Sequence, residues 1–173
     1  MAVVQASLRV ISAEKDVPLS QLAERMNSFL YRSSGASKYA TFFYAQLQSN
    51  GRRLRFVNAG HNPPLLAHNT EAGIQVTELG AGGPPLGLFP KMQYEEAEVE
   101  LLPGDAMLAF TDGVPEALNE QGEEFGEIRL KELLCASSGS TAEEIAAIVS
   151  REVRDWIGAA EQHDDITLVA VKV

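Results

Sequence analysis

Residues 106–118 read AMLAFTDGVPEAL, and this stretch decides the fold because it joins an apolar run to an acidic turn. The apolar residues 106–110 fit a buried strand, which a Pro-Gly-Asp turn at 103–105 precedes. Asp112 then stands where the strand ends, and Gly113 leaves the backbone free to approach a ligand closely. Beyond Asp112 we expect a short helix.

The C-terminal stretch QHDDITLVAVKV, residues 162–173, mirrors this arrangement. Asp164 and Asp165 stand directly before a second apolar run that reads as a buried strand. If the two runs pair antiparallel, the end of the first lies beside the start of the second, so Asp112 and Asp164 converge. Two carboxylates at one sheet edge repel each other unless they are protonated or bridged by a cation, and hard oxygen ligands suit Mg²⁺ or Mn²⁺. In the alternative interpretation Asp112 is a turn residue that caps a helix, and Asp164 and Asp165 are solvent-exposed residues at the start of a strand.

Composition narrows the class of protein. The chain has 173 residues, which fits one domain, since domains cluster near about 100–150 residues. With 14 Lys and Arg against 24 Asp and Glu, the net charge is −10, which argues against nucleic-acid binding. Cys135 is the only cysteine, so no intrachain disulfide can form and a reducing compartment is indicated. No apolar run reaches the ~20 residues of a membrane span, and the N-terminus lacks a signal-peptide pattern, so we expect a cytoplasmic protein.

The N-terminal half predicts two helices followed by strands. Residues 1–11 have helical spacing but no capping residue, and they read like the middle of a helix. A second helix begins after the capping residue Asp16, with Pro18 in its first turn, and ends before Gly35. Residues 40–48 and 53–59 then form a hairpin around Asn50-Gly51, the strongest hairpin signal.

The middle of the chain continues the strands. Residues 64–68 and 74–79 read as another strand pair, joined by a turn at 69–73. Residues 80–90, GAGGPPLGLFP, must be a shaped loop, and residues 95–101 alternate as a half-exposed strand does. The strands are consecutive, so the sheet should be largely antiparallel.

The C-terminal part predicts a loop and two helices. A Gly- and Glu-rich loop at 119–126 leads to a helix that runs through Cys135, which we interpret as a packing residue. Thr141 and Glu144 form a capping box before the last helix. The stripe of that helix consists of Ile145, Ile148, Val149, Glu152 and Trp156; only Glu152 breaks its apolar pattern, and we expect the other four residues in the core. Helices cluster at both ends of the sequence, so an α+β layered domain is favoured over alternating βαβ units.

Four blocks carry a resemblance to a known family. They are NAGHNPPLL at 58–66, GGPPLGL at 82–88, FTDGVPEALNEQGEEFG at 110–126 and the terminal HDDITLVAVKV at 163–173. Together and in order they resemble the C-terminal two-thirds of bacterial metal-dependent Ser/Thr protein phosphatases of the stage II sporulation protein E type, in the PPM or type 2C superfamily. The resemblance covers essentially the whole chain. It implies an α-β-β-α sandwich of mostly antiparallel sheets.

The resemblance also implies a site and a substrate. Such enzymes hold a two-metal Mn²⁺ or Mg²⁺ centre, which activates water for attack on phosphoserine or phosphothreonine. Asp112 matches the metal ligand of the family's TDG block, and Asp164 matches that of its DD[IM]T block. The metal-site candidates are therefore Asp112, Gly113, Asp164 and Asp165. Of these, Asp165 is expected to support the metal ligands and not to bind the metal itself. The implied partner is a phosphorylated STAS-type anti-sigma-factor antagonist in a partner-switching pathway.

The chain departs from the family pattern at its start. The family's two earlier acidic blocks, GGDxY and GDxxGxG, do not occur here, and MAVVQASLRV resembles the helix that follows the second block. We therefore expect residues 1–173 to form a single, N-terminally truncated phosphatase domain with a partial metal site. Such a chain should be inactive alone and should self-associate through an open sheet edge or its first helix.

Three further residues are weaker candidates for substrate binding. His61 could touch phosphate or metal, although residues 58–64 more simply make a structural turn. Gly83 and Gly87 could cradle a phosphate, but no helix start or lysine follows them, so loop shaping is the simpler role. A competing hypothesis for the whole chain is a non-catalytic docking module with a degenerate metal site.

Overall fold

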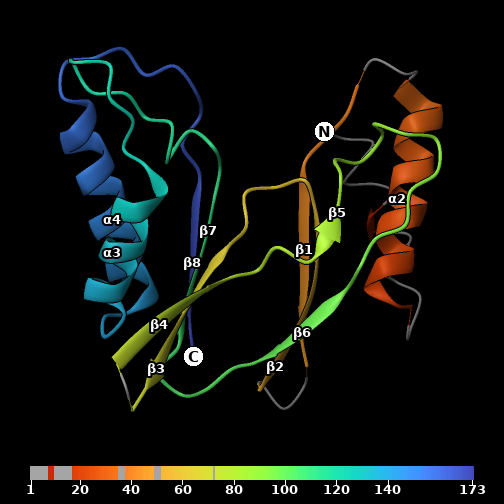
Figure 1. Ribbon diagram of the computed structural model, residues 1–173, viewed down its shortest axis with the longest axis horizontal. Coiled ribbons are helices and arrows are strands. Elements are labelled where there is room, and N and C mark those ends of the chain that lie inside the picture. Colours follow the sequence, from red (N-terminus) through yellow and green to blue (C-terminus); the bar gives the residue numbers. More distant parts are fainter. Residues whose placement is uncertain (1–7, 10–16, 35–37, 49–51, 72) are drawn as a thin grey trace. The chain divides into compact units, whose positions relative to one another are not determined.

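The computed structural model describes residues 8–9, 17–34, 38–48, 52–71 and 73–173 (Figure 1). They divide into two compact units. The first unit comprises Met1–His61 and Gly80–Leu101, and the second comprises Asn62–Leu79 and Leu102–Val173. Each unit has its own sheet and its own apolar core.

The first unit is a small sheet with a helix packed against it. Its elements are α2 (Leu19–Ser34), β1 (Phe42–Leu47), β2 (Arg53–Ala59), β5 (Gly82–Gly83) and β6 (Ala97–Glu100). β2 is central, because it pairs antiparallel with β1 and β6 and parallel with the short β5. The core between helix and sheet includes Leu19, Leu22, Met26, Val57 and Leu86.

Polar contacts hold α2 at its start and near its middle. At its start the Glu96 carboxylate accepts hydrogen bonds from the Ser20 backbone N–H (3.0 Å) and the Arg55 side chain (2.8 Å). Burial alone would raise the pKa of Glu96, but these hydrogen bonds outweigh it and lower the pKa below its usual value. Further along, the fully buried Asn27 donates to Phe89 O (3.0 Å) and accepts from the N–H of Gly87 (2.8 Å), so the loop at 80–90 is held against the helix.

The second unit is a four-stranded antiparallel sheet covered by two helices. The strand order is β4 (Gly73–Glu78), β3 (Leu65–Thr70), β7 (Ala106–Phe110) and β8 (Leu168–Lys172). The helices α3 (Glu127–Ser137) and α4 (Ala142–Ile157) lie side by side on one face of this sheet (Figure 1). Alternate residues of β7, namely Ala106, Leu108 and Phe110, are buried in the core that the helices share with the sheet.

The main sequence predictions for the fold are confirmed. The chain is α+β with mainly antiparallel sheets, the expected strands are present, and so are the helices expected before Gly35, through Cys135 and after Thr141. The capping box of α4 forms, with Thr141 Oγ1 accepting from the N–H of Glu144 and Glu144 accepting from the N–H of Thr141. Of the expected helix at 1–11 only Leu8 and Arg9 are described, both helical, and the Asn50-Gly51 turn lies outside the described residues.

Several local predictions were wrong. The turn expected at 69–73 is shorter, since β3 continues to Thr70 and β4 begins at Gly73. Gly82 and Gly83 form the short strand β5 inside the expected loop, because a glycine there lets the chain lie against β2: a Cβ on Gly82 would come within 1.6 Å of Asn58 O. No helix follows Asp112, where the backbone makes consecutive turns instead.

The burial of the C-terminal elements also differs from expectation. The run at 166–173 was expected to be a buried strand, but β8 ends the strand order, and its residues alternate between half-buried and exposed. In α4 the fully buried residues are Ile145, Val149 and Val153, whereas Ile148 and Trp156 are half-buried, and Trp156 packs against the core. Among the described residues, no helix is both long and apolar enough to cross a membrane.

Candidate metal centre

Asp112 begins a compact turn that follows β7 directly. Its side-chain Oδ1 accepts from the N–H of Gly113 (3.1 Å), and its carbonyl accepts from the N–H of Glu116 (3.0 Å). The side chain is exposed, while Gly113, Val114 and Pro115 behind it are buried. The Asp112 carboxylate is therefore exposed to solvent, while the three residues that follow it in the turn are buried.

Pairing of β7 with β8 brings the second acidic segment beside this turn. Phe110 lies opposite Leu168 in the antiparallel register, and the ladder continues one residue further, with the N–H of Thr111 donating to Thr167 O (3.1 Å). The Thr111 hydroxyl accepts from the N–H of Thr167 (3.0 Å) and donates to Asp165 O (2.9 Å). The predicted antiparallel pairing is thus confirmed, and it aligns the Asp112 turn with the residues just before β8.

Gly113 is the point of closest approach between the two segments. A Cβ on Gly113 would come within 2.6 Å of Asp165 O, which is shorter than any ordinary contact. From the sequence we expected the missing side chain of Gly113 to let a ligand come close to the backbone. In the structure the group that lies close to Gly113 is the main chain of Asp165.

Asp164 repeats the local arrangement of Asp112. Its Oδ1 accepts from the N–H of the following residue, Asp165 (2.7 Å), and its carbonyl accepts from the side-chain amide of Gln162 (2.7 Å). Asp164 and Gly113 both line a small cavity of about 60 Å³, together with Glu116, Ala117, Leu118, Ile157, Glu161, Gln162, His163 and Ile166. The carboxylates of Asp112 and Asp164 are therefore carried by adjoining, hydrogen-bonded segments of one unit.

The donor set fits part of a divalent-cation site. Exposed carboxylate oxygens are the ligands that Mg²⁺ and Mn²⁺ prefer, and Asp112, Asp164 and Asp165 supply them on adjoining segments. Within the described ranges, no group of three or more His, Cys, Asp or Glu side chains is arranged to hold a metal ion. That Asp112 and Asp164 reach a single cation, with Gly113 and Asp165 beside them, stays a prediction.

Two residues that hold this turn in place were not predicted from the sequence. One is Thr111, whose hydroxyl bonds were not anticipated. The other is Trp156, expected in the core, whose indole N–H donates to Ala117 O and Glu123 O, each at 3.2 Å. A half-buried tryptophan usually finds a partner for its N–H, and this general tendency is the only sequence signal that pointed to such a role.

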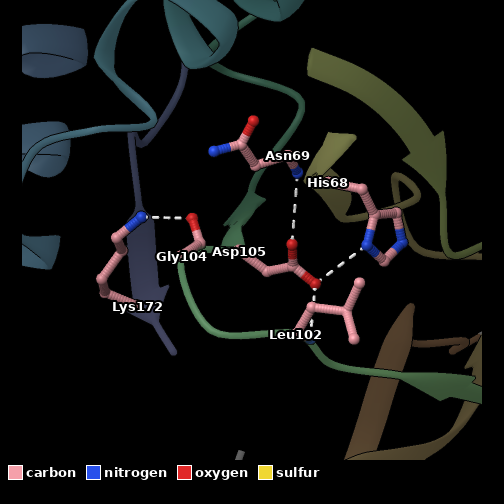
Figure 2. Close-up of polar contacts among 6 residues, drawn as sticks. All are labelled: His68, Asn69, Leu102, Gly104, Asp105 and Lys172. Atoms are coloured by element: carbon pink, nitrogen blue, oxygen red, sulfur yellow. Dashed lines mark hydrogen bonds and ion pairs between the residues drawn. The ribbon is translucent and has the colours of Figure 1, made fainter. Parts of the chain in front are cut away.

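The opposite end of β7 is anchored by a buried carboxylate. Asp105 was expected only as a turn residue, but its side chain is fully buried and accepts from the N–H of Leu102 (2.8 Å) and of Asn69 (3.4 Å) (Figure 2). It also lies 2.8 Å from Nδ1 of His68. Figure 2 shows Lys172 of β8 donating to Gly104 O beside it, and the same ammonium donates to Ser138 O. These contacts join β3, β7 and β8 at that end.

The candidate substrate residues His61, Gly83 and Gly87 belong to the first unit. The N–H of His61 donates to Asn58 Oδ1 (2.8 Å) and its carbonyl accepts from the Asn58 amide (2.9 Å), so residues 58–61 form the expected structural turn. Gly83 packs closely on Tyr94, where a Cβ would come within 2.9 Å of the ring. Gly87 has a φ of 82° and donates its N–H to Asn27. These contacts are structural, and a role in substrate binding stays a prediction.

Comparison with known proteins identifies the class. Residues 1–173 match the family model described as Stage II sporulation protein E, so the chain belongs to that family. Its fold is that of type 2C phosphatase domains: the SiaA-PP2C domain of Pseudomonas aeruginosa matches with a TM-score of 0.83 at 20% identity, over 99% of this chain and 68% of that chain.

Two curated relatives are similar to this chain in sequence. The phosphoserine phosphatase RsbU of Bacillus subtilis is 25% identical over 162 residues, which are 92% of this chain and 46% of RsbU. Protein IcfG of Synechocystis is 35% identical over 133 residues, 77% of this chain and 20% of IcfG. The chain thus spans less than half the length of these relatives, and it belongs to a family whose members include protein phosphatases.

Proposed function

We propose that this chain is part of the catalytic domain of a Mn²⁺- or Mg²⁺-dependent protein serine/threonine phosphatase. The observation that carries the proposal is the pairing through Thr111, which sets the Asp112 turn against the Asp164-Asp165 segment. Family membership gives this pairing its chemical meaning, because it joins the two acidic blocks that match the family's motifs.

The roles of the individual residues follow from their contacts. Asp112 and Asp164 would bind metal through their exposed carboxylates, while Gly113 and the main chain of Asp165 hold the two segments together. A bound divalent cation supplies charge neutralisation and an activated water for phosphoester hydrolysis. Solved relatives include a SpoIIE phosphatase domain presoaked with Mn and RsbX in complex with magnesium, which supports either ion here.

The substrate is a phosphorylated protein in this proposal. RsbU and RsbP, both similar to this chain, are named phosphoserine phosphatases. By analogy we propose a STAS-type anti-sigma-factor antagonist as substrate and the cytoplasm as the location, with His61, Gly83 and Gly87 near the bound phosphoprotein. That residues 1–173 form a single domain stays a prediction, and so does self-association, which light scattering of the purified chain would check.

Metal binding by the purified chain tests the proposal first. We expect weak Mn²⁺ binding by the 173-residue chain, measured by electron paramagnetic resonance of free Mn²⁺, and its loss in Asp112→Asn and Asp164→Asn. An amide weakens a hard-cation site but changes the side-chain volume little, so both variants should keep the circular dichroism spectrum of the wild type. Wild-type affinity in either variant would contradict the assignment.

Activity then separates a phosphatase from a docking module. The chain alone should not hydrolyse a phosphoserine protein, because the GGDxY and GDxxGxG blocks are absent from its sequence. If the DNA upstream of the Met1 codon encodes both blocks in frame, the longer protein should dephosphorylate a phosphorylated antagonist with Mn²⁺ present. Asp112→Asn in that longer protein should abolish turnover. An upstream sequence without the blocks would instead support the docking module, and robust turnover by the short chain would reject the mechanism.

A further inference from the structure

We propose that Trp156 is a positioning residue for the metal-binding turn at Asp112, an inference that rests on the proposed function. The indole N–H donates to Ala117 O at 3.2 Å, five residues beyond Asp112, and to Glu123 O at the same distance. Trp156 belongs to α4, so these bonds join the turn to a helix whose other residues pack in the core of the second unit.

Hydrogen bonds hold the turn at its start, at Pro115 O, which accepts from the N–H of Gly126 (2.8 Å), and at its end, where Trp156 is one of the donors. At its start, Thr111 bonds to Thr167 and to Asp165 O. At its end, Ala117 O accepts both the indole N–H and the N–H of Phe125 (2.9 Å). The residues between these points are linked by bonds from the N–H of Val114 to Thr111 O (3.0 Å) and from the N–H of Glu116 to Asp112 O (3.0 Å). A displacement at Ala117 is therefore transmitted along a short bonded turn to Asp112.

The indole itself is held in one orientation by its neighbours. The guanidinium carbon of Arg129 lies 3.9 Å from the centroid of the Trp156 ring and 5.3 Å from that of Phe125. Phe125 and Trp156 meet edge to face, with ring centroids 6.2 Å apart. Arg129 also donates to Phe125 O. Because cation and aromatic contacts orient the ring, its single N–H is aimed at the two carbonyls.

A positioning role and ordinary core packing predict different effects when Trp156 is replaced. A tryptophan that only fills space could be replaced by phenylalanine with a loss of stability alone. A positioning tryptophan loses its N–H donor in that substitution, and the metal site should respond as well. Partners that orient metal ligands directly contribute about 10–100-fold to metal affinity, so a residue one step further away should contribute roughly 3–10-fold.

The test compares Mn²⁺ affinity among four forms of the full 173-residue chain. Trp156→Phe removes the N–H donor but keeps an aromatic ring beside Arg129. Ser137→Ala is the matched control: it also removes one side-chain donor in the second unit, but that donor bonds Leu133 O within α3. Asp112→Asn reports on the metal site itself. Free Mn²⁺ is measured by electron paramagnetic resonance, and thermal unfolding is followed in parallel.

We expect Trp156→Phe to bind Mn²⁺ roughly 3–10-fold more weakly than wild type, while Ser137→Ala binds like wild type. Unchanged affinity in Trp156→Phe, with binding lost in Asp112→Asn, would overturn the role of Trp156 and leave the proposed metal site intact. Equal weakening in Trp156→Phe and Ser137→Ala would show a general loss of stability and would also overturn the inference. Unchanged affinity in Asp112→Asn, or no Mn²⁺ binding by wild type, would reject the metal site and the inference with it.

Discussion

The hydroxyl of Thr111 donates a hydrogen bond of 2.9 Å to the main-chain carbonyl of Asp165. The same hydroxyl accepts from the N–H of Thr167, so a single side chain joins the end of β7 to the segment before β8. These two segments carry Asp112 and Asp164. The relative placement of the two carboxylates therefore depends on a residue that is not itself acidic.

Thr111→Val should weaken both the second unit and its metal site. Valine keeps the branched shape but loses both hydroxyl bonds, each worth about 0.5–1.5 kcal/mol, so we expect the free energy of unfolding to fall by about 1–2 kcal/mol. Chemical denaturation gives this change, and Mn²⁺ titration should show reduced affinity. Thr70→Val is the control, because its hydroxyl bonds Gly73 O at the turn between β3 and β4. If both variants bound Mn²⁺ like wild type, Thr111 would have no influence on the site.

Gly113→Ala should be more disruptive than its size suggests. The added Cβ would come within 2.6 Å of Asp165 O, a main-chain atom that can move only if the two segments separate. Overpacking of this kind costs about 1–3 kcal/mol, and separation of the segments should also lower Mn²⁺ affinity. Gly139→Ala is the control, since nothing lies within 4 Å of a Cβ at that position, and its stability should stay within about 0.5 kcal/mol of wild type. Similar stability of the two variants would show that the segments are not tightly joined at Gly113.

Asp105→Ala should destabilise the second unit strongly. It removes a buried carboxylate that accepts from Leu102 and Asn69 and contacts His68, which leaves their donors without this acceptor (Figure 2). Hydrogen bonds to charged groups contribute about 1.5–3 kcal/mol each, so the two short contacts, to Leu102 and His68, predict a loss of roughly 3–6 kcal/mol in the free energy of unfolding. Asp155→Ala, an exposed position on α4, should change it by less than about 0.5 kcal/mol. A small effect at Asp105 would mean that other contacts join β3, β7 and β8.

The elements that could be predicted are those whose signals are local. The helical spacing of apolar residues and the capping motif predict α4, and Thr141 and Glu144 form the expected capping box. The antiparallel pairing of β7 with β8 was also predicted from the sequence, because both are short apolar runs, the first followed by Asp112 and the second preceded by Asp164 and Asp165. That placement was enough to bring Asp112 and Asp164 onto adjoining segments.

The features that could not be predicted depend on contacts between distant residues. Asp105 reads as a turn residue, and its burial depends on His68 and Asn69, more than thirty positions away. Trp156 reads as a core residue, since nothing in the helix stripe shows that Ala117 O lies within reach of its N–H. The exposure of β8 could not be foreseen either, because an apolar run has the same pattern at the centre of a sheet and at the end of the strand order.

Tyr94 should make the stability of the first unit depend on pH in the alkaline range. Its phenol is 5% exposed, and burial, followed by the nearby charge of Glu24, raises its pKa to about 12. In the unfolded chain a tyrosine has a pKa of about 10, so the folded state holds the proton more tightly. The stabilisation is therefore fully present below about pH 10 and is lost as the pH rises towards 12, at up to about 1.4 kcal/mol per pH unit.

Replacing the phenol isolates this contribution. Tyr94→Phe cannot ionise, so its stability should fall less steeply than that of wild type between pH 10 and about 12. It also loses the hydrogen bond to Asn27 (3.4 Å), which should lower its stability slightly at every pH. Denaturant unfolding at several pH values measures both effects, and Tyr39→Phe, at a position that is 65% exposed, should follow the wild-type slope. Parallel curves for wild type and Tyr94→Phe would show that Tyr94 ionises equally easily in the folded and unfolded states, contrary to its burial against α2.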